Sequence, residues 1–269
     1  MSKRSHSCDA GFIALIPAAG IASRLPQVVG SKEMLPVAAA GVGHPPGVET
    51  EPVICHLLRS LRQAGATETR IVLRTGKWDI PEYLSQHDWN DLNLKFVFTR
   101  GTSGVPETVA TGLRDRPGAN ILFGFPDILF EPVDAMKKLG RRLLDSEADV
   151  ILGAFPTLNS AKMDMVKIEQ DDRVSTIEIK PEHTSLEFTW ITAAWTPSFT
   201  DYFLDLQQNA PARVQRQAAA HADLHLGHSL QLAIDDGLRV EAQVFTSGRS
   251  LDIGTPDDLG KAQNWLKRD

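Results

Sequence analysis

The chain has 269 residues, of which 42% are hydrophobic and 23% are charged. These proportions are those of an ordinary globular protein, and they exclude a collagen-like, coiled-coil or disordered chain. With 28 basic and 34 acidic residues the net charge is −6, which argues against DNA or RNA as the main partner.

The first half of the chain alternates strand-like and helix-like segments. Apolar runs without polar alternation predict strands buried on both faces, at Phe12–Ile16, Arg70–Leu73, Leu94–Phe98, Asn120–Phe123 and Val150–Ala154. Helical patterns lie between them at Glu51–Ala64, with Pro52 in the first turn, and at Pro132–Leu144. This order predicts an α/β fold: a Rossmann-like, mostly parallel sheet with helices on both faces.

The pattern changes after about residue 155. The expected strands and helices there are Met165–Glu169 and Val174–Lys180 as an antiparallel pair, strand Phe188–Trp195, helices Phe199–Gln208 and Ser229–Asp236, strand Leu238–Phe245 and a closing helix Pro256–Leu266. The Gly/Pro-rich segment Ala39–Gly47 is expected to be a surface loop. No linker separates independent domains. We therefore expect a flexible leader at residues 1–10 and a single domain at 11–269, with a second lobe from its C-terminal half.

Cysteine content and hydropathy bear on the compartment. Cys8 lies in the polar leader and Cys55 in a predicted helix, so no structural disulfide is expected. No apolar run approaches the roughly 18 residues of a membrane-spanning helix. The run Phe12–Ala19 is short for a signal peptide and fits a strand. The sequence thus predicts a cytoplasmic protein with no membrane partner.

Small residues follow the first predicted strand, at Pro17-Ala18-Ala19-Gly20. They let backbone N–H groups approach an anionic or flat ligand, at the edge where open parallel sheets bind ligands. The dinucleotide pattern G-x-G-x-x-G fails at Ala22 and Leu25, and the phosphate-loop pattern is absent. Taken alone, the loop is explained more simply as a strand-to-helix turn that needs small residues for packing.

Two cations follow this loop. Arg24 can bind phosphate oxygens through two parallel hydrogen bonds, and Lys32 supplies a point charge. Together with the loop they are what a nucleoside triphosphate requires. The alternative is that both side chains are solvated on the surface, which is the usual fate of a single basic residue.

Three N-terminal segments form a longer pattern, namely Pro17-Ala18-Ala19-Gly20, Ser23-Arg24-Leu25 and Lys32-Glu33-Met34-Leu35-Pro36-Val37. This pattern resembles the signature of sugar-1-phosphate nucleotidylyltransferases, A-A-G-x-G-[ST]-R-L followed by P-K-x-[LM]-L-P-[VI]. It is most similar to glucose-1-phosphate uridylyl- and thymidylyltransferases. Ala22 stands where the second glycine is usual, and Ser31 where a proline is usual. The resemblance implies the nucleotide-diphospho-sugar transferase fold, with a nucleotide-binding part at about 11–155 and an acceptor-binding part at about 156–269.

Two further segments resemble the nucleotide half of this family. Gly101–Leu113 is similar to a G-x-[AG]-x-A-[LV] stretch whose glycine lets the nucleotide base lie close, which implies that role for Gly104. Gly124-Phe125-Pro126-Asp127-Ile128 is similar to the G-D-[DN] element, which implies that Asp127 binds the metal.

Two segments resemble the acceptor half. Ile177–Pro181 is similar to an E-K-P element, which assigns Lys180 to the sugar phosphate, although Ile179 replaces the glutamate. Leu251–Pro256 matches D-I-G-T-P, which implies that Asp252 is a second metal ligand.

The strand Thr189–Trp195 falls where the resembled enzymes line the sugar pocket. A small residue leaves room for a hexose, which assigns Thr192 to sugar-phosphate binding. Trp190 or Trp195 could stack on the sugar, but the alternative that both belong to the core is favoured by the area they bury. Met163–Val166 stands at the place of a Y-G-[VM] sugar contact and does not match it.

The two aspartates also make chemical sense together. Asp127 follows a central predicted strand, and Asp252 follows the strand Leu238–Phe245 through a short turn. Two carboxylates with open coordination positions suit Mg²⁺, which prefers oxygen ligands and keeps waters for substrate phosphates. The alternatives are a helix N-cap for Asp127 and a capping or turn residue for Asp252.

The resemblance implies a reaction between an NTP, UTP or dTTP, and a sugar 1-phosphate such as glucose 1-phosphate, giving an NDP-sugar and pyrophosphate with Mg²⁺ as cofactor. It assigns Arg24, Lys32 and Asp127 to catalysis. The residues assigned to nucleotide binding are Ala18, Ala19, Gly20, Ser23 and Gly104. A homo-oligomer is left open.

Other functions remain at this point. A cytidylyltransferase acting on a non-sugar phosphate shares the P-A-A-G start, whereas D-I-G-T-P favours the sugar branch. A catalytically silent nucleotide-sugar sensor is a second alternative. A nicotinamide-dependent oxidoreductase is disfavoured because its glycine pattern is missing.

Two remaining features have no place in that reaction. His221, His225 and His228 would share a face, with Asp223 nearby, if residues 211–226 were helical; such a face could bind Zn²⁺, but an exposed polar face is the favoured interpretation. The conspicuous Lys77-Trp78-Asp79 loop has no assigned role.

Overall fold

The computed structural model describes residues 11–21, 30–38, 50–218, 223–263 and 265. The predicted leader at 1–10 and the predicted loop Ala39–Gly47 lie outside this range, as do Ser23 and Arg24. Among the described residues, no helix is long and apolar enough to cross a bilayer.

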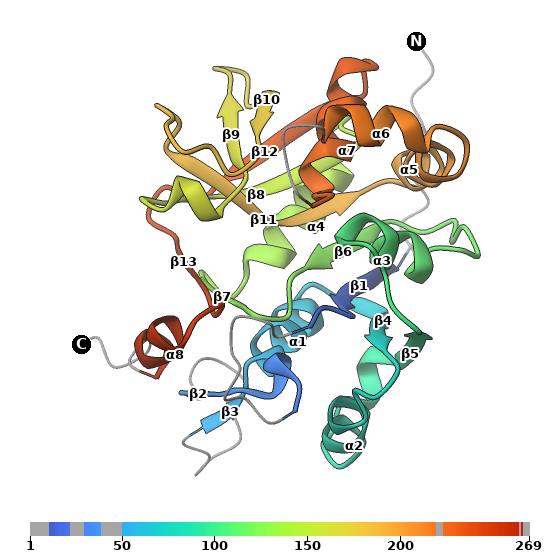
Figure 1. Cartoon of the computed structure of the whole chain (residues 1–269), viewed down its shortest axis with the longest axis vertical. Coiled ribbons are helices and arrows are strands. Elements are labelled where there is room, and N and C mark those ends of the chain that lie inside the picture. Colours follow the sequence, from blue (N-terminus) through green and yellow to red (C-terminus); the bar gives the residue numbers. More distant parts are fainter. Residues whose placement is uncertain (1–10, 22–29, 39–49, 219–222, 264, 266–269) are drawn as a thin grey trace.

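A nine-stranded sheet forms the centre of the molecule (Figure 1). Its strands are β1 (Phe12–Ala18), β4 (Ala66–Arg74), β5 (Leu94–Thr99), β6 (Ile121–Gly124), β8 (Val150–Pro156), β9 (Met165–Ile168), β10 (Val174–Glu178), β11 (Phe188–Trp195) and β12 (Val240–Val244). The order is β10-β9-β11-β6-β1-β4-β5, and β8 joins β11 to β12. Only β10 and β11 run against the other strands of this sheet. The predicted mostly parallel sheet is confirmed.

Helices cover both faces of the sheet, as the alternation of segments predicted. The helices are α1 (Ile54–Gln63), α2 (Asp79–Ser85), α3 (Val105–Gly112), α4 (Ala135–Asp145), α5 (Pro197–Asn209), α6 (Pro211–Gln217), α7 (Leu226–Asp235) and α8 (Pro256–Ala262), with single 3₁₀ turns η1 (Lys32–Met34), η2 (Asn90–Leu92) and η3 (Ser160–Lys162). One hydrophobic cluster joins α1, α2 and α4 to the sheet, and a second joins α3, α5 and α7. The two clusters form the two main layers of the core.

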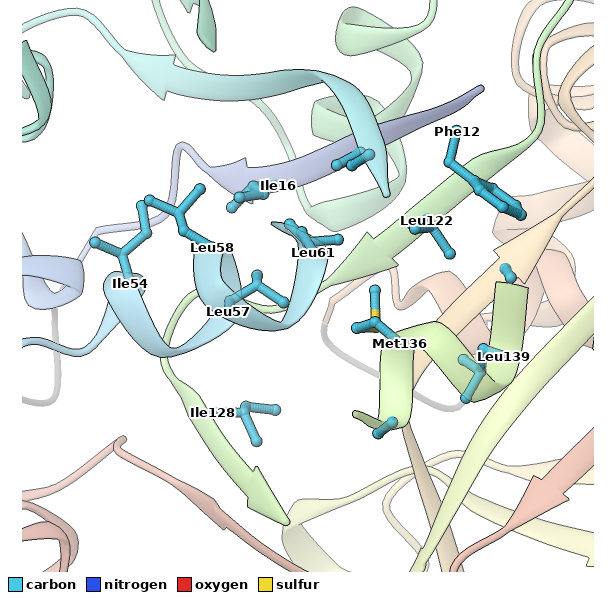
Figure 2. Packing of buried hydrophobic residues seen from close by; sticks show 14 of the residues in the cluster. Phe12, Ile16, Ile54, Leu57, Leu58, Leu61, Leu122, Ile128, Met136 and Leu139 are labelled. Atoms are coloured by element: carbon cyan, nitrogen blue, oxygen red, sulfur yellow. The ribbon is translucent and has the colours of Figure 1, made fainter. Parts of the chain in front are cut away.

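Helix α1 shows how the sequence specifies this packing. Ile54, Leu57, Leu58 and Leu61 recur at helical spacing and are all fully buried. Figure 2 shows Leu58 and Leu61 directed toward Ile16 of β1. A continuous apolar stripe thus fixes the helix against the parallel part of the sheet.

The predicted start of this helix at Glu51 was wrong. Strand β3 (Thr50–Pro52) pairs with β2 (Pro36–Ala38), so Glu51 and Pro52 are extended rather than helical. Glu51 is buried and forms an ion pair with Arg59 of α1. The pairing with a distant strand therefore overrides the local helical signal.

A second two-stranded sheet was not predicted. Strands β7 (Ile128–Glu131) and β13 (Arg249–Asp252) pair antiparallel, and Figure 1 shows them between α8 and the main sheet. The closing helix α8 is shorter than predicted and ends at Ala262. Because β7 and β13 are 118 residues apart at their outer pair, Glu131 and Arg249, only the folded chain brings the adjoining segments together.

Candidate active site

A cavity of about 490 Å³ opens at the carboxyl ends of β1 and β6. Its floor and walls come from both halves of the chain: Ala19 and Gly20 after β1, Gly104 at the start of α3, Trp190 of β11, and the segment that enters α7. This is the edge at which open α/β sheets bind ligands.

One side of the cavity is made of small residues. Ala19 and Gly20 line it, whereas Ala18 is buried in β1 beneath them. Gly104 lies on the facing wall, where a Cβ atom would stand 2.8 Å from the backbone oxygen of Leu224. A side chain at residue 104 would therefore clash with the opposite half of the chain, which explains the glycine.

Arg74 is a lining residue that the sequence did not single out. It ends β4, the strand beside β1, and its Nε donates a hydrogen bond to the Ala19 carbonyl oxygen over 3.1 Å. A basic residue at the carboxyl end of a neighbouring parallel strand was a usable signal, because those ends meet at one edge.

Lys32, Asp127 and Asp252 meet at one corner of the cavity, which we call the phosphate corner. Lys32 Nζ forms an ion pair with Asp127 Oδ2. The backbone N–H of Ile253 donates to the Asp127 carbonyl oxygen over 2.9 Å, and Asp252 lies opposite Ile128 in the β7–β13 pair. The predicted association of these three residues is therefore observed.

The capping alternatives for the two aspartates are wrong. Asp127 is followed by strand β7, not by a helix. Asp252 ends β13, and the N-cap of α8 is Thr255, whose side-chain oxygen accepts from the backbone N–H of Asp258. Asp252 also does not follow the strand β12 directly, because β13 intervenes.

The charges at the phosphate corner reinforce one another. Burial alone lowers the pKa of Lys32, but Asp127, Glu33 and Asp252 together raise it above its usual value. Lys32 is therefore held as a cation at the cavity. The carboxylates around it suit a divalent cation, which could bridge them to an anionic ligand.

The predicted loop at Lys77-Trp78-Asp79 instead leads into α2, which begins at Asp79, and these residues hold the turn that carries Lys32. Lys77 Nζ donates to both carboxylate oxygens of Glu33 at 2.8 Å, and the Glu33 side chain is only 1% exposed. Asp79 accepts from the Ser31 backbone N–H and from its hydroxyl, both at 2.7 Å. Burial raises the pKa of Glu33, and Lys77 opposes that shift. The contacts link residues 44 and 48 positions apart, so sequence spacing could not reveal them.

The donor set at the phosphate corner fits Mg²⁺. Asp127 and Asp252 offer carboxylate oxygens, which a hard cation prefers, at the wall of an open cavity where substrate phosphates can complete the coordination. No group of three or more His, Cys, Asp or Glu side chains able to hold a metal exists among the described residues. A site with few protein ligands is typical of Mg²⁺ and unlike a closed structural zinc site.

A second group of cavity-lining residues, which we call the acceptor end, consists of Lys180, Asp164 and Trp190. Burial raises the pKa of the Asp164 carboxyl to about 6, although the charge of Lys180 opposes the shift. Asp164 was not assigned a role from the sequence, but the mismatch of Met163–Val166 to the resembled pattern was a signal.

Some side chains of β11 line the cavity, and others are buried in the core. Trp190 lines the cavity while packing against Phe125. Trp195 is fully buried, and its Nε1 donates to the Thr200 hydroxyl over 3.0 Å. Thr192 is also buried and does not line the cavity. The structure thus brings Lys180 but not Thr192 to the acceptor end.

The predicted histidine face is not a single helical face. Helix α6 ends at Gln217 and α7 begins at Leu226. His225 lines the cavity, and its backbone N–H donates to Nδ1 of the buried His228 over 3.0 Å. His221 lies outside the described residues. The hydrogen bond places His228 in the capping of α7 rather than on a metal-binding surface.

Comparison with known proteins agrees with this geometry. The chain matches no protein-family model and no curated protein. Its fold matches a structure assigned as a glucose-1-phosphate thymidylyltransferase from Bacillus anthracis, in complex with sucrose (TM-score 0.77, 15% identity, 97% of this chain and 96% of that chain). It also matches a UDP-glucose pyrophosphorylase complexed with UDP-glucose (TM-score 0.76, 16% identity, 96% and 100%).

A UDP-glucose pyrophosphorylase from Acinetobacter baumanii is a third match (TM-score 0.71, 18% identity, 94% of this chain and 92% of that chain). The near-complete coverage in all three cases means that both halves of the chain take part in the likeness. The chain therefore has the fold of the sugar-1-phosphate nucleotidylyltransferases, as the sequence resemblance implied.

Proposed function

We propose that the protein is a nucleotidyltransferase that joins an NTP and a sugar 1-phosphate into an NDP-sugar and pyrophosphate. The observation that carries the proposal is the meeting of Lys32, Asp127 and Asp252 at the cavity of this fold. UTP or dTTP and glucose 1-phosphate are the proposed substrates. The substrates in the names of the structurally similar enzymes support that choice.

In the proposed reaction a phosphate oxygen of the acceptor attacks the α-phosphorus of the NTP in line. The new P–O bond forms as the bond to pyrophosphate breaks, and the phosphate monoester is already nucleophilic, so no general base is required. The protein contributes positioning and charge neutralisation. Catalysis then depends on where the cations and carboxylates stand.

The residues have separate parts in this scheme. Lys32 binds the nucleotide phosphates, and Asp127 and Asp252 would hold Mg²⁺, which neutralises charge on the α-phosphate when bound. Lys180 binds the phosphate of the acceptor. Arg24, outside the described residues, is proposed to stabilise the leaving pyrophosphate.

The nucleoside and the acceptor would occupy different halves of the chain. Ala19, Gly20 and Gly104, together with Ser23, form the proposed nucleoside-binding wall within residues 11–155, and Ala18 supports it from within β1. Residues 156–269 form the acceptor-binding part. Thr192 is not among the proposed acceptor residues, since its side chain lies in the core and does not line the cavity. A cytoplasmic location is part of the same proposal.

Pyrophosphate release in the presence of Mg²⁺ tests the proposal. UTP, dTTP, CTP, ATP and GTP are each combined with glucose 1-phosphate, glycerol 3-phosphate and phosphoethanolamine. Release with UTP or dTTP and glucose 1-phosphate is expected. Release only with CTP and a non-sugar phosphate would replace the proposal by a cytidylyltransferase. Binding of NTPs without release from any pair would indicate a silent sensor.

A further inference from the structure

Arg74 is a cation at the cavity that the proposed reaction does not yet use. Among the described residues its guanidinium has no carboxylate partner, whereas Lys32, which also lines the cavity, is paired with Asp127. Its terminal nitrogens Nη1 and Nη2 also have no hydrogen-bond acceptor in the described part of the chain, yet they are not buried. Because a guanidinium only donates, these N–H groups are available to a ligand that accepts.

The protein fixes the place of these donors. Arg74 Nε donates to the Ala19 carbonyl oxygen over 3.1 Å. The rest of the guanidinium lies against Gly101, where a Cβ atom would stand 2.9 Å from Nη1 and 3.5 Å from Nη2. Gly101 is itself held, because its backbone N–H and its carbonyl oxygen both bond to the Thr99 hydroxyl, over 3.3 and 3.1 Å. Arg74 therefore joins Ala19 to the segment that leads from Gly101 to Gly104, and both belong to the proposed nucleoside-binding wall.

The order of the strands separates Arg74 from the phosphate corner. Strand β1 lies between β4, which ends at Arg74, and β6, which precedes Asp127. Neighbouring strands are about 4.8 Å apart, so the ends of β4 and β6 are about 10 Å from each other. A nucleotide with its phosphates at Asp127 and its nucleoside on the wall beside Ala19 therefore brings its base to Arg74.

We propose that Arg74 is a specificity-determining residue, whose terminal N–H groups donate to a carbonyl oxygen of the nucleotide base. The inference rests on the proposed function, in which the nucleotide is UTP or dTTP. Uracil and thymine carry a carbonyl oxygen at the position where cytosine and adenine carry an amino group. An amino group cannot accept from a guanidinium, so a contact at that position also selects between bases.

Calorimetry of nucleotide binding, with Mg²⁺ and without acceptor, tests the contact. In Arg74→Met the Kd of UTP or dTTP should rise at least about tenfold, through loss of a hydrogen bond from a charged donor. The matched control is Arg100→Met, because Arg100 is exposed and does not line the cavity. That variant should keep the Kd within about twofold of the wild type.

Thio analogues of the base identify the oxygen. In 2-thio-UTP and 4-thio-UTP, or the matching dTTP analogues, sulfur replaces one carbonyl oxygen and is a weak acceptor. One analogue should bind the wild type more weakly than its parent nucleotide does, but bind Arg74→Met equally well, since the hydrogen bond is then absent in both cases. A purely structural role of Arg74 would lower all affinities in proportion and leave the preference unchanged.

A second variant keeps the arginine. In Gly101→Ala the new Cβ atom displaces Nη1 of Arg74, so the Kd of the nucleotide should rise severalfold. The same substitution added to Arg74→Met should have no further effect, because the displaced group is already gone. Additive effects of the two substitutions would show that Gly101 acts by another route and would contradict the inference.

The outcomes separate this inference from the proposed function. An unchanged nucleotide Kd in Arg74→Met overturns the inference alone. A loss that is equal for the parent nucleotide and both thio analogues overturns it too, since Arg74 would then act on the phosphates or on the wall. A wild type that binds nucleotide but releases no pyrophosphate from any pair overturns the proposed function only, because the pattern of Kd values still tests the base contact. A wild type that binds no nucleotide overturns both.

Discussion

Two groups of residues in the cavity, the phosphate corner and the acceptor end, differ in whether their polar atoms have hydrogen-bond partners within the protein. At the phosphate corner the charges are paired within the protein, Lys32 with Asp127 and Lys77 with Glu33. At the acceptor end, Asp164 Oδ1 and Trp190 Nε1 have no partner among the described residues. One cavity is therefore lined both by ion-paired charges around Lys32 and by buried polar atoms without a described partner beside Lys180.

The largest effect is expected from a substitution that disrupts the phosphate corner. Asp127→Asn removes a carboxylate charge that Lys32 pairs with and that would hold Mg²⁺, so turnover should fall by about 10²–10³-fold or more. Pyrophosphate release at saturating substrates measures the loss. Asp171→Asn makes the same change on an exposed turn and should keep full turnover. Activity of Asp127→Asn near that of the control would remove Asp127 from the mechanism.

The next largest effect is expected at the ion pair between Lys77 and Glu33, which supports the turn that carries Lys32. Lys77→Ala leaves the buried Glu33 carboxylate unpaired, which should lower the free energy of unfolding by about 3 kcal/mol. Urea unfolding measures it. The double variant Lys77→Met with Glu33→Gln removes both charges and should recover most of the stability. If the double variant lost as much as the sum of the two single changes, the pair would not be coupled.

The pH dependence of stability tests the contact between His56 and β7, the strand that follows Asp127. His56 Nε2 accepts from the backbone N–H of Phe130 over 3.2 Å, and burial lowers the pKa of His56 to about 4. Because the unfolded state binds a proton at about pH 6.5, stability is lost as the pH falls from 6.5 toward 4, by up to about 3 kcal/mol.

Urea unfolding between pH 7 and pH 4 measures this dependence. Relative to wild type, His56→Gln should flatten the curve in that window, whereas His87→Gln, at an exposed site, should not. Parallel curves for wild type and His56→Gln would show that His56 titrates normally in the folded protein.

The smallest expected effect concerns Lys180, which lines the acceptor end from an exposed position. Lys180→Ala should raise the KM for glucose 1-phosphate by about tenfold through loss of a charged hydrogen bond, and leave the KM for the NTP unchanged. Steady-state kinetics with each substrate varied in turn measures both constants. Lys167→Ala on β9 is the exposed control. Equal changes in both constants would reject the assignment of Lys180 to the acceptor.

Much of the fold followed from local patterns. Apolar runs predicted the buried parallel strands, and apolar residues at helical spacing predicted α1. The errors arose where distant segments pair: β3 replaced the predicted first turn of α1 because it pairs with β2, and β7 with β13 formed an unpredicted sheet. Such pairings depend on tertiary contacts that periodicity does not contain.

The candidate site likewise contains residues that local sequence patterns predict and residues that only distant contacts bring into place. Lys32, Asp127 and Asp252 lie in short sequence patterns and come together as expected. Lys77 and Asp79 could not be assigned, because their partners are more than 40 residues away. Thr192 was assigned from its place in the chain, but the pairing of β11 with β8 shifts register between Trp190 and Thr192, and Thr192 faces the core.

The phosphate corner is proposed to support nucleotidyl transfer. Its most direct test is mass spectrometry of the products formed by the purified chain from a mixture of UTP, dTTP and glucose 1-phosphate with Mg²⁺. We predict an NDP-hexose and pyrophosphate in equal amounts, and at least about a hundredfold less of both in the same time with Asp127→Asn. Intact substrates, or an NDP with inorganic phosphate and no NDP-hexose, would contradict the account.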